Sequence, residues 1–359
     1  MFHIILTLDY EIHGNGDGDP YKLIIEPTER LLNLLEKFGA RLTIMADVAE
    51  ILKFKEYRDK KGEDKFHYGL IVSQLQRAIL NGHDVQLHIH SGYFDSEYNN
   101  GRWEQNWDEY DLANLPYERI FERIKTCKEF LEFNLRQVKK DYQCIAFRAA
   151  NWSMTPTKDI YKALVANGIK IDTSVFKYGK RKGRVKFNYD SAFHDIVPWF
   201  ADKHDICEVD VNGSLLEVPI YCENRNLLAF LTPIRAFRFI RAKFHKHKKI
   251  SDISQYQEFN RKKQKRRKNV YVKMRNLLLR KHAWKLDFNQ AGCFQIIRAI
   301  NRIEKRFSNS RDDLPIVLIG HSKTFIKGNE LFMRSFLRFV KSNPEMYCFS
   351  TFQKFLKVI

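Results

Sequence analysis

The organisation of the chain is clearest in one segment, Gly82-His83-Asp84-Val85-Gln86-Leu87-His88-Ile89-His90. Its apolar-rich part, 85–89, predicts a β-strand that ends in two histidines spaced two residues apart. Side chains at that spacing point to the same face of a strand. His88 and His90 are therefore expected to lie together at a carboxyl strand end, where α/β sheets and barrels usually place their sites. Neutral imidazole is the commonest ligand for zinc and related metals; the alternative is a pair of edge-strand histidines without a metal.

Similar strands recur along the chain and alternate with helices. Further strands of the buried type are expected at 2–8, 41–45, 144–147, 170–175, 215–220 and 315–319. Amphipathic helices are expected at 27–38, 68–80, 116–134 and 155–167. The repeated order of strand, loop and helix predicts an α/β fold with a parallel sheet that is closed or partly closed.

Polar residues follow several of these strands. Asp9 and Glu11 end the first strand, again two residues apart, so both carboxylates can face one pocket. Two histidines and a carboxylate with an open position form a catalytic zinc pattern that also fits iron, cobalt or manganese. Arg148 can hold a carboxylate by two hydrogen bonds, and a histidine such as His321 can act as a general acid. A structural salt bridge and a loop histidine explain Arg148 and His321 singly, but their shared position after strands favours one site.

The composition fits a protein with a large core. The chain has 359 residues, of which 44% are hydrophobic, enough for two domains or one α/β barrel. It contains no apolar run of the roughly 18–20 residues that a membrane span needs, and segment 1–6 predicts a strand rather than a signal peptide. The six cysteines are scattered without a CxxC pair, which favours a reducing compartment. We therefore expect a cytoplasmic protein.

The formal net charge of +19 points to an anionic partner. Much of the charge lies in segment 225–289, where the strand and helix pattern breaks and basic runs occupy 245–249 and 261–268. Between 227 and 241, apolar residues interleave with arginines, as in stretches that lie on anionic membrane surfaces. The alternative is a solvated insertion, and nucleic acid is less favoured because no binding motif accompanies the charge. We predict barrel segments at 1–224 and 290–359, separated by a basic, mainly helical insertion at 225–289.

Five motifs, in their order and spacing, resemble the polysaccharide deacetylase, or NodB-homology, family. They are Leu6-Thr7-Leu8-Asp9-Tyr10-Glu11, Gly82-His83-Asp84 through His88 and His90, Phe147-Arg148-Ala149, Asp172-Thr173-Ser174-Val175-Phe176 and Leu318-Ile319-Gly320-His321. The resemblance covers residues 1 to about 220 and resumes near 314. It implies a distorted (β/α) barrel of the NodB-homology type and a metal-dependent deacetylase activity.

The resemblance also implies a metal site. Glu11, His88 and His90 would hold a divalent metal, zinc in the first place, with cobalt, iron or manganese as alternatives. The family's usual second histidine lies four residues after the first, where this chain has Gly92. His90 takes its place, and this Leu-His-Ile-His form resembles a subgroup of the family.

The same motifs imply catalytic roles for three residues. Asp9 would be the base, Arg148 would steady it, and His321 would protonate the leaving amine. Tyr10 separates the two acids that are adjacent in the family. Base and ligand could therefore also be exchanged between Asp9 and Glu11; by position we assign Asp9 as the base.

Other residues are expected to support the site. Trp103 and Trp107, in the aromatic stretch 91–115, and Trp152 could stack on sugar rings. His83 is interpreted as a turn residue or a support of the metal site. Asp172 is interpreted as an internal partner for a cation.

Together these features predict a metal-dependent deacetylase of an N-acetylated or O-acetylated sugar. Its substrate is expected to be an intermediate of surface-polysaccharide synthesis, and a lipid-linked intermediate would be met at the inner face of the membrane through residues 225–289. One alternative is a catalytically altered barrel that binds an anionic glycan, a membrane surface or nucleic acid. The other is a hydrolase of a different non-peptide C–N bond, such as a cyclic amide.

Overall fold

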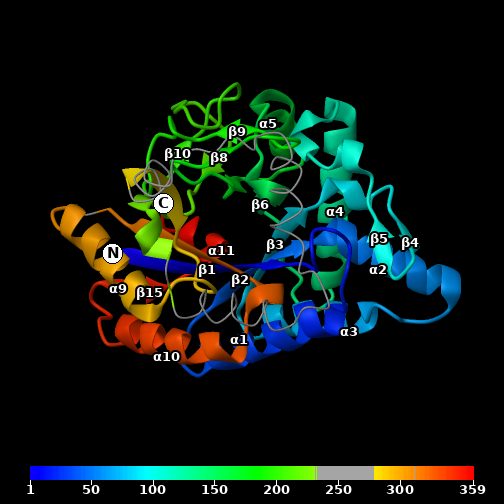
Figure 1. The fold of residues 1–359 in the computed structure, drawn as a ribbon, viewed down its shortest axis with the longest axis horizontal. Coiled ribbons are helices and arrows are strands. Elements are labelled where there is room, and N and C mark those ends of the chain that lie inside the picture. Colours follow the sequence, from blue (N-terminus) through cyan, green and yellow to red (C-terminus); the bar gives the residue numbers. More distant parts are fainter. Residues whose placement is uncertain (231, 233–278, 311) are drawn as a thin grey trace, which may run out of the picture.

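A curled mixed sheet forms the centre of the structure, with helices packed around its outside (Figure 1). The computed structural model describes residues 1–230, 232, 279–310 and 312–359. In this part of the chain nine strands form the sheet in the order β10-β11-β7-β6-β3-β2-β1-β14, and β15 also pairs with β1. They are β1 (Phe2–Tyr10), β2 (Leu42–Asp47), β3 (Asp84–Ile89), β6 (Ala146–Ala149), β7 (Ile171–Asp172), β10 (Trp199–Phe200), β11 (Leu216–Glu217), β14 (Leu314–His321) and β15 (Tyr347–Phe349). Neighbouring strands are parallel, except for the antiparallel pair β10 and β11.

The chain after β11 brings the two edges of the sheet toward each other. Beside β7, the backbone N–H of Val218 donates to the carbonyl of Asp172. Two residues later, Ile220 bridges Val317 of β14 in parallel register. The sheet therefore curls as in a distorted barrel, in agreement with the fold class expected from the sequence.

Amphipathic helices cover the outer face of the sheet. They are α1 (Glu26–Glu36), α2 (Val48–Lys61), α3 (Tyr68–Leu80), α4 (Tyr117–Leu135), α5 (Thr157–Ala166), α9 (Cys293–Arg306), α10 (Lys327–Lys341) and α11 (Phe352–Phe355), and the π-helical turn η1 (Tyr21–Ile25) precedes α1. In α9, for example, the buried residues Ile296, Ile300 and Ile303 recur at the spacing of one helix face. Burial of such faces against the strands supplies the main stabilisation of the fold.

The strands that carry the predicted site have a polar inner face and an apolar outer face. In β3, Gln86 and His88 alternate with Val85 and Leu87, and all four are buried. The inward Gln86 is satisfied because its Oε1 accepts from the backbone N–H groups of 145 and 146, at 2.8 and 2.7 Å. The buried Gln86 side chain is thus paired with backbone groups at the start of the neighbouring strand, as most buried polar groups are.

Most expected elements are present, but two strands are shorter than the sequence predicts. The helix expected at 68–80 is α3, whereas β7 covers two residues of the expected strand at 170–175. The Thr173 N–H still donates to the Phe147 carbonyl of β6, but beyond this bond side chains enter the pairing with β6. The Thr173 carbonyl accepts from the Arg148 side chain, and Ser174 Oγ accepts from the Ala149 N–H. Similarly, β11 covers two residues of the expected strand at 215–220.

Small two-stranded sheets and short 3₁₀ turns fill the connections. The pairs are β4 (Glu97–Asn99) with β5 (Arg102–Glu104), β8 (Lys180–Arg181) with β9 (Phe187–Asn188), and β12 (Cys222–Asn226) with β13 (Lys281–Lys285). The expected insertion at 225–289 has its ends in β12, the turn η6 (Leu227–Phe230) and β13. The basic runs at 245–249 and 261–268, and most of the amphipathic stretch 227–241, lie outside the described residues. Among the described helices, none has the length and hydrophobicity needed to cross a lipid bilayer.

Candidate metal centre

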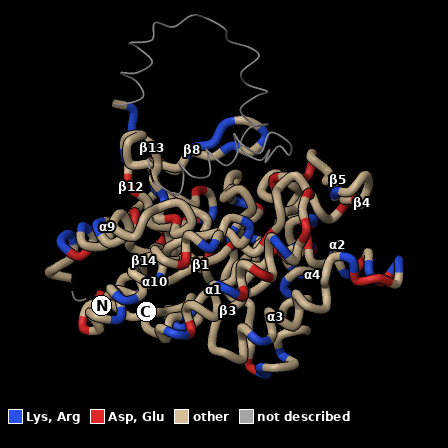
Figure 2. The backbone as a smooth tube through the Cα atoms, turned by 60° about the horizontal axis from the view of Figure 1, so that its bottom comes forward, with Lys and Arg blue, Asp and Glu red and all other residues tan. Residues whose placement is uncertain are grey.

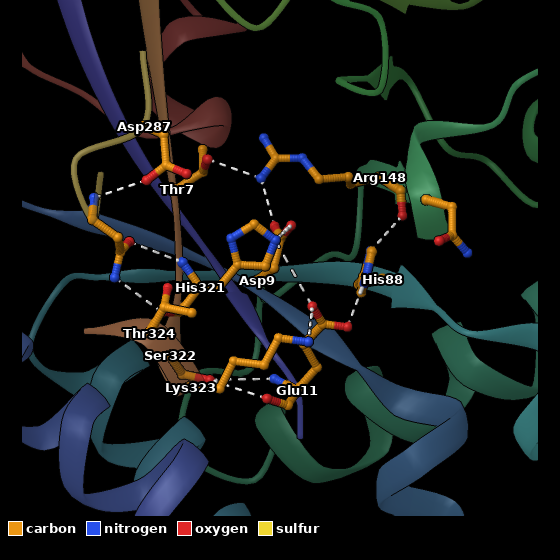
Figure 3. A network of polar contacts seen from close by, with 12 residues as sticks. Thr7, Asp9, Glu11, His88, Arg148, Asp287, His321, Ser322, Lys323 and Thr324 are labelled. Atoms are coloured by element: carbon orange, nitrogen blue, oxygen red, sulfur yellow. Dashed lines mark hydrogen bonds and ion pairs between the residues drawn. The ribbon is translucent and has the colours of Figure 1, made fainter. Parts of the chain in front are cut away.

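The predicted site residues meet because the sheet register places their strands' carboxyl ends side by side. Asp9 of β1 lies opposite His321 of β14. His88 of β3 lies opposite Arg148 of β6. Glu11 follows β1 and completes the group (Figure 3).

Glu11, His88 and His90 present three ligand atoms to one another. The Nε2 atoms of His90 and His88 lie 2.6 and 3.8 Å from Glu11 Oε2. All three side chains are 3–8% exposed. Candidate ligand atoms of the three residues lie within 4.8 Å of one another, and the same holds for Asp9, Glu11 and His321.

The two histidines are oriented by groups behind them. His88 Nδ1 donates to the carbonyl of Arg148 at 2.8 Å, so a neutral His88 has its Nε2 lone pair directed at Glu11. The backbone N–H of His90 donates to Asp47 Oδ1 at 3.1 Å. A hydrogen bond from the second ring nitrogen is the usual way in which a metal-binding histidine is fixed.

Asp9 is held apart from this trio by Arg148. Asp9 Oδ1 accepts from Arg148 Nη1 at 2.7 Å, and the same nitrogen donates to Thr7 Oγ1 at 2.9 Å. Arg148 is fully buried, and its Nε donates to the Thr173 carbonyl at 3.1 Å. The carboxylate therefore has one oxygen fixed by a buried cation and the other directed toward His321.

His321 stands across from Asp9 at the end of β14. Its Nε2 lies 3.4 Å from Asp9 Oδ2 and 3.9 Å from Glu11 Oε1. Asn289 clamps its backbone: the His321 N–H donates to Asn289 Oδ1 at 3.0 Å, and Asn289 Nδ2 donates to the His321 carbonyl at 3.1 Å. The Trp152 and His321 rings pack nearly perpendicular to each other, with 6.1 Å between ring centroids.

The charges of the site favour a cation among the carboxylates. Burial acts to raise the pKa of Glu11, but Lys323 and the two histidines outweigh it and hold that pKa well below its usual value. Burial also acts to raise the pKa of Asp9, and Arg148, His321 and His88 together lower it. For His88 burial acts in the opposite sense, yet Glu11 and Asp9 raise its pKa to about 9.

The electrostatics of His321 are different. Burial lowers its pKa, and the neighbouring Asp9 and Glu11 only partly offset this. Burial therefore favours the neutral ring, so His321 must take up a proton before it can act as an acid.

The donor set fits a divalent metal. Two imidazole nitrogens and a carboxylate oxygen converge in a buried place, as in sites that leave a position open for water or substrate. Without a metal, the raised pKa of His88 means that a proton lies between this imidazole and Glu11, and a metal ion would take the place of that proton. In addition, His90 Nδ1 and Asp47 Oδ2 are buried atoms without a hydrogen-bond partner among the described residues.

The three tryptophans expected to bind substrate lie in different surroundings. Trp152 packs on His321, as described above. Trp107 is 43% exposed and packs on Tyr110, whose ring lies 6.3 Å from that of His90. Trp103 is not brought to the site, because it is buried in an aromatic cluster with Phe54, Tyr57, Phe66 and Tyr98.

The two residues expected to support the site lie farther from its centre. His83 is a turn residue at the opposite end of β3, where its Nδ1 accepts from the Leu42 N–H at 3.0 Å. Asp172 is fully buried beside β6, and its Oδ1 accepts from Ser174 Oγ at 2.7 Å. Burial raises the pKa of Asp172, and the charge of Arg148 acts on that pKa in the opposite direction.

The structure adds residues that the sequence pattern did not single out. Lys323 Nζ lies 3.2 Å from Glu11 Oε1 and donates to the Ile12 carbonyl at 2.9 Å. Asp47, which receives the His90 N–H, ends β2 and could have been found by the same rule that found Asp9. Asn289 and Lys285 belong to the segment that breaks the strand and helix pattern, so no periodic signal marked them.

Comparison with known proteins identifies the fold. No protein-family model matches the sequence, and no curated protein matches it. A candidate glycoside hydrolase/deacetylase from Parabacteroides distasonis aligns with 99% of this chain and 71% of its own, with a TM-score of 0.54 and 10% identity. A candidate polysaccharide deacetylase from Mycobacterium smegmatis covers 99% and 89%, with a TM-score of 0.50 and 12% identity. A 4-alpha-glucanotransferase from Thermococcus litoralis covers 100% and 40%, with a TM-score of 0.50 and 14% identity.

These similarities agree with the deacetylase-type fold that the motifs implied. At such identities they establish the fold alone, because one fold supports several chemistries. The function has to be argued from the residues of the site.

Proposed function

We propose that this chain is a metal-dependent hydrolase that removes an acetyl group from an N-acetylated or O-acetylated sugar. One observation carries the proposal. The buried trio of Glu11, His88 and His90 lies next to Asp9, and His321 lies across from Asp9. The Asp9 carboxylate is fixed by the buried Arg148. This combination provides a metal site, a base and an acid within reach of one scissile bond, which is what amide or ester hydrolysis requires.

Glu11, His88 and His90 would hold the metal, with zinc preferred and cobalt, iron or manganese as alternatives. A divalent ion bound there would supply a Lewis acid that polarises the acyl carbonyl and lowers the pKa of water. The two oxygens of Glu11 support its role as a ligand, since Oε2 faces the histidines while Oε1 is paired with Lys323.

Asp9 would accept the proton of the attacking water. Its low pKa keeps it ionised at neutral pH, and Arg148 holds it with one oxygen free. His321 would deliver a proton to the leaving amine or alcohol from the other side of the site. The opposite assignment of Asp9 and Glu11 is disfavoured, because one oxygen of Asp9 is bonded to Arg148 and the other faces His321.

Aromatic side chains beside the site suit a sugar substrate. Trp152 packs on His321, and the exposed Trp107 lies on the His90 side next to Tyr110. Sugar rings commonly stack on such surfaces through their apolar faces. We propose Trp152 and Trp107 as substrate contacts, and we assign Trp103 to the core.

We also propose the setting in which this reaction occurs. The substrate would be a cytoplasmic, lipid-linked intermediate of surface-polysaccharide synthesis, and the basic residues within 225–289 would bring the enzyme to an anionic membrane surface. The net charge of +19 supports this second part.

The proposal is tested by measuring acetate release from a panel of acetylated sugars. The protein is stripped with a chelator and supplied with Zn²⁺ or Co²⁺, and a cyclic amide is included to detect another C–N hydrolase. We expect release that requires metal and that falls by about 10²–10⁴-fold in Asp9→Asn. Asp313→Asn is the matched control, because Asp313 precedes β14 at the opposite end of the sheet.

Two results would count against the proposal. One is a folded, metal-supplied protein that releases no acetate from any member of the panel. The other is an Asp9→Asn variant that retains the full rate. Hydrolysis of the cyclic amide alone would instead identify the other C–N hydrolase.

A further inference from the structure

Lys285 is a cation beside the site that the proposed reaction does not use. It ends β13, and its Nζ lies 3.1 Å from the centroid of the Trp152 ring and 4.3 Å from that of Phe176. Trp152 is the residue that packs on His321. The ammonium group is therefore held on an aromatic platform that borders the proposed general acid.

The position of Lys285 is fixed by the sheet rather than by a flexible loop. It pairs with Cys222 of β12, and the next residue, Leu286, donates its N–H to the Tyr221 carbonyl at 3.0 Å. Asp287 then bridges Ile319 of β14, two residues before His321. The same stretch of chain thus carries Lys285 and, at Asn289, the clamp on the His321 backbone.

The charge of Lys285 is not neutralised within the described part of the chain. The other two cations at the site have carboxylate partners: Arg148 pairs with Asp9, and Lys323 with Glu11. No carboxylate of the described residues lies within 4.0 Å of Lys285 Nζ; Asp287 and Asp9 act on it from farther away. Burial, opposed by these two acids, lowers the pKa of Lys285 to about 7.

Without a carboxylate partner the protonated form of Lys285 is disfavoured, and a ligand that supplies negative charge would favour it. Aromatic contact supports such a cation only partly, and it leaves the hydrogen-bond donors of Nζ that do not face the rings available to another group. A carboxylate or phosphate oxygen is the group that would complete this arrangement.

We propose that Lys285 binds an anionic oxygen group, carboxylate or phosphate, on the substrate next to the acyl group that is removed. The inference rests on the proposed function and narrows it, because the preferred substrate becomes an acidic or phosphorylated amino sugar. Lys285 is then a specificity-determining residue, and Trp152 both holds it and contacts the sugar.

The test compares matched substrates that differ in charge. These are N-acetylglucosamine, N-acetylglucosamine 1-phosphate and N-acetylglucosaminuronic acid, so that phosphate and carboxylate are distinguished. We expect kcat/KM for one anionic substrate to exceed that for the neutral sugar by at least about tenfold. In Lys285→Gln this ratio should fall to near one through a higher KM, and Lys285→Arg should restore most of it.

Lys281→Gln is the control, because Lys281 is an exposed lysine on the same strand, and its ratio should not change. Equal kcat/KM for neutral and anionic sugars, or a ratio unaffected by Lys285→Gln, would overturn the inference while leaving the hydrolase proposal intact. A metal-supplied wild-type protein that hydrolyses nothing would instead reject the hydrolase.

A binding measurement keeps the inference testable in that case. Calorimetric titration of N-acetylglucosamine 1-phosphate and N-acetylglucosaminuronic acid into wild type and Lys285→Gln should show a loss of affinity of about tenfold or more for one of them. Circular dichroism of each variant verifies folding. Equal affinity of the two folded proteins for both anions would overturn the inference.

Discussion

Glu11 uses its two carboxylate oxygens for different neighbours, and this division organises the site. Oε2 faces the two histidines, whereas Oε1 pairs with Lys323 and approaches His321. Asp9, two residues earlier, is tied to Arg148. Two carboxylates at the end of the same strand thus acquire separate environments, and environment is what allows similar groups to take different catalytic roles.

Arg148 gives the first prediction at the scale of single residues. Replacing it by methionine leaves Asp9 buried without its cation, so Arg148→Met should lower the free energy of unfolding by about 3–5 kcal/mol. Acetate release should also be lost, because Asp9 is no longer oriented. Urea denaturation and the acetate assay measure the two effects.

The double variant Asp9→Asn/Arg148→Met is the informative comparison for Arg148. It removes both charges, so it should recover part of the stability lost in Arg148→Met but none of the activity. An Arg148→Met protein as stable as wild type would contradict the role of the buried ion pair.

Asp84 provides a prediction that depends on pH. Burial raises the pKa of this carboxyl to about 7 in the folded state, from an ordinary value of 3.8. Between pH 3.8 and about pH 7 the unfolded chain releases this proton while the folded protein keeps it. The free energy of unfolding of wild type therefore falls as pH rises to about 7. Asp84→Asn should match wild type near pH 4 and exceed it at pH 8 by on the order of 2–4 kcal/mol.

Denaturant titrations at the two pH values test this, with the exposed Asp141→Asn as control. The same difference between Asp84→Asn and wild type at pH 4 and pH 8 would show that the carboxyl is not perturbed by burial.

The sequence alone identifies many of the residues that meet at the site, but not all of them. Asp9, His88, Arg148 and His321 could be found because each ends a predicted strand, and parallel strands share one edge. The burial of Trp103 could not be found, since the polar, aromatic composition of segment 91–115 is equally typical of a surface loop. Its contacts with residues of α2 depend on tertiary packing that no local pattern encodes.

At the scale of elements, the junction of β13 and β14 determines where His321 lies. The chain from Lys285 to Asn289 runs beside β14, and Asn289 bonds both backbone groups of His321. Gly320 allows this approach, because a Cβ at that position would collide with the Asn289 side chain and the Phe288 ring. The acid of the proposed reaction is therefore positioned by a segment far away in the sequence.

Gly320→Ala should displace His321 without removing the metal ligands. We expect kcat to fall by about tenfold or more, because a small misplacement of a catalytic group has a large effect on rate. The metal content should stay at the wild-type level. Gly292→Ala is the control, since a Cβ there meets no atom within 4 Å; an active Gly320→Ala enzyme would contradict the proposed clamp.

Elements with clear periodicity were predictable and elements fixed by distant partners were not. Helix α3 matches its prediction, because an amphipathic pattern runs along its length and an Asn-Gly pair follows its last residue. Strands β12 and β13 were not predicted as a pair. The paired residues of these two strands are more than fifty positions apart in the chain, and the many charged residues between them obscure the strand pattern.

At the scale of the whole molecule, the charges of the described helix α2 are distributed differently from those of the long basic runs. Along α2, basic and acidic side chains are intermixed and form ion pairs (Figure 2). The long basic runs at 245–249 and 261–268 have no comparable acidic partners in sequence. We expect these runs, rather than the barrel, to attract an anionic surface.

Co-sedimentation with vesicles tests this expectation. The protein should bind vesicles that contain phosphatidylglycerol and should dissociate as salt is raised, because screening weakens attraction between charges. Replacing the lysines and arginines of 261–268 with glutamine should reduce binding, while binding to pure phosphatidylcholine vesicles should stay low for both proteins. Unchanged sedimentation of the variant would contradict a role for this run.

We propose that Glu11, His88 and His90 together hold one divalent ion. The most direct measurement is the zinc content of the purified, zinc-equilibrated protein, compared with His88→Ala/His90→Ala and with the exposed-histidine control His204→Ala. We expect one ion per chain in wild type and in His204→Ala, and almost none in the double variant. A full equivalent of tightly bound zinc in the double variant, or none in wild type, would contradict it.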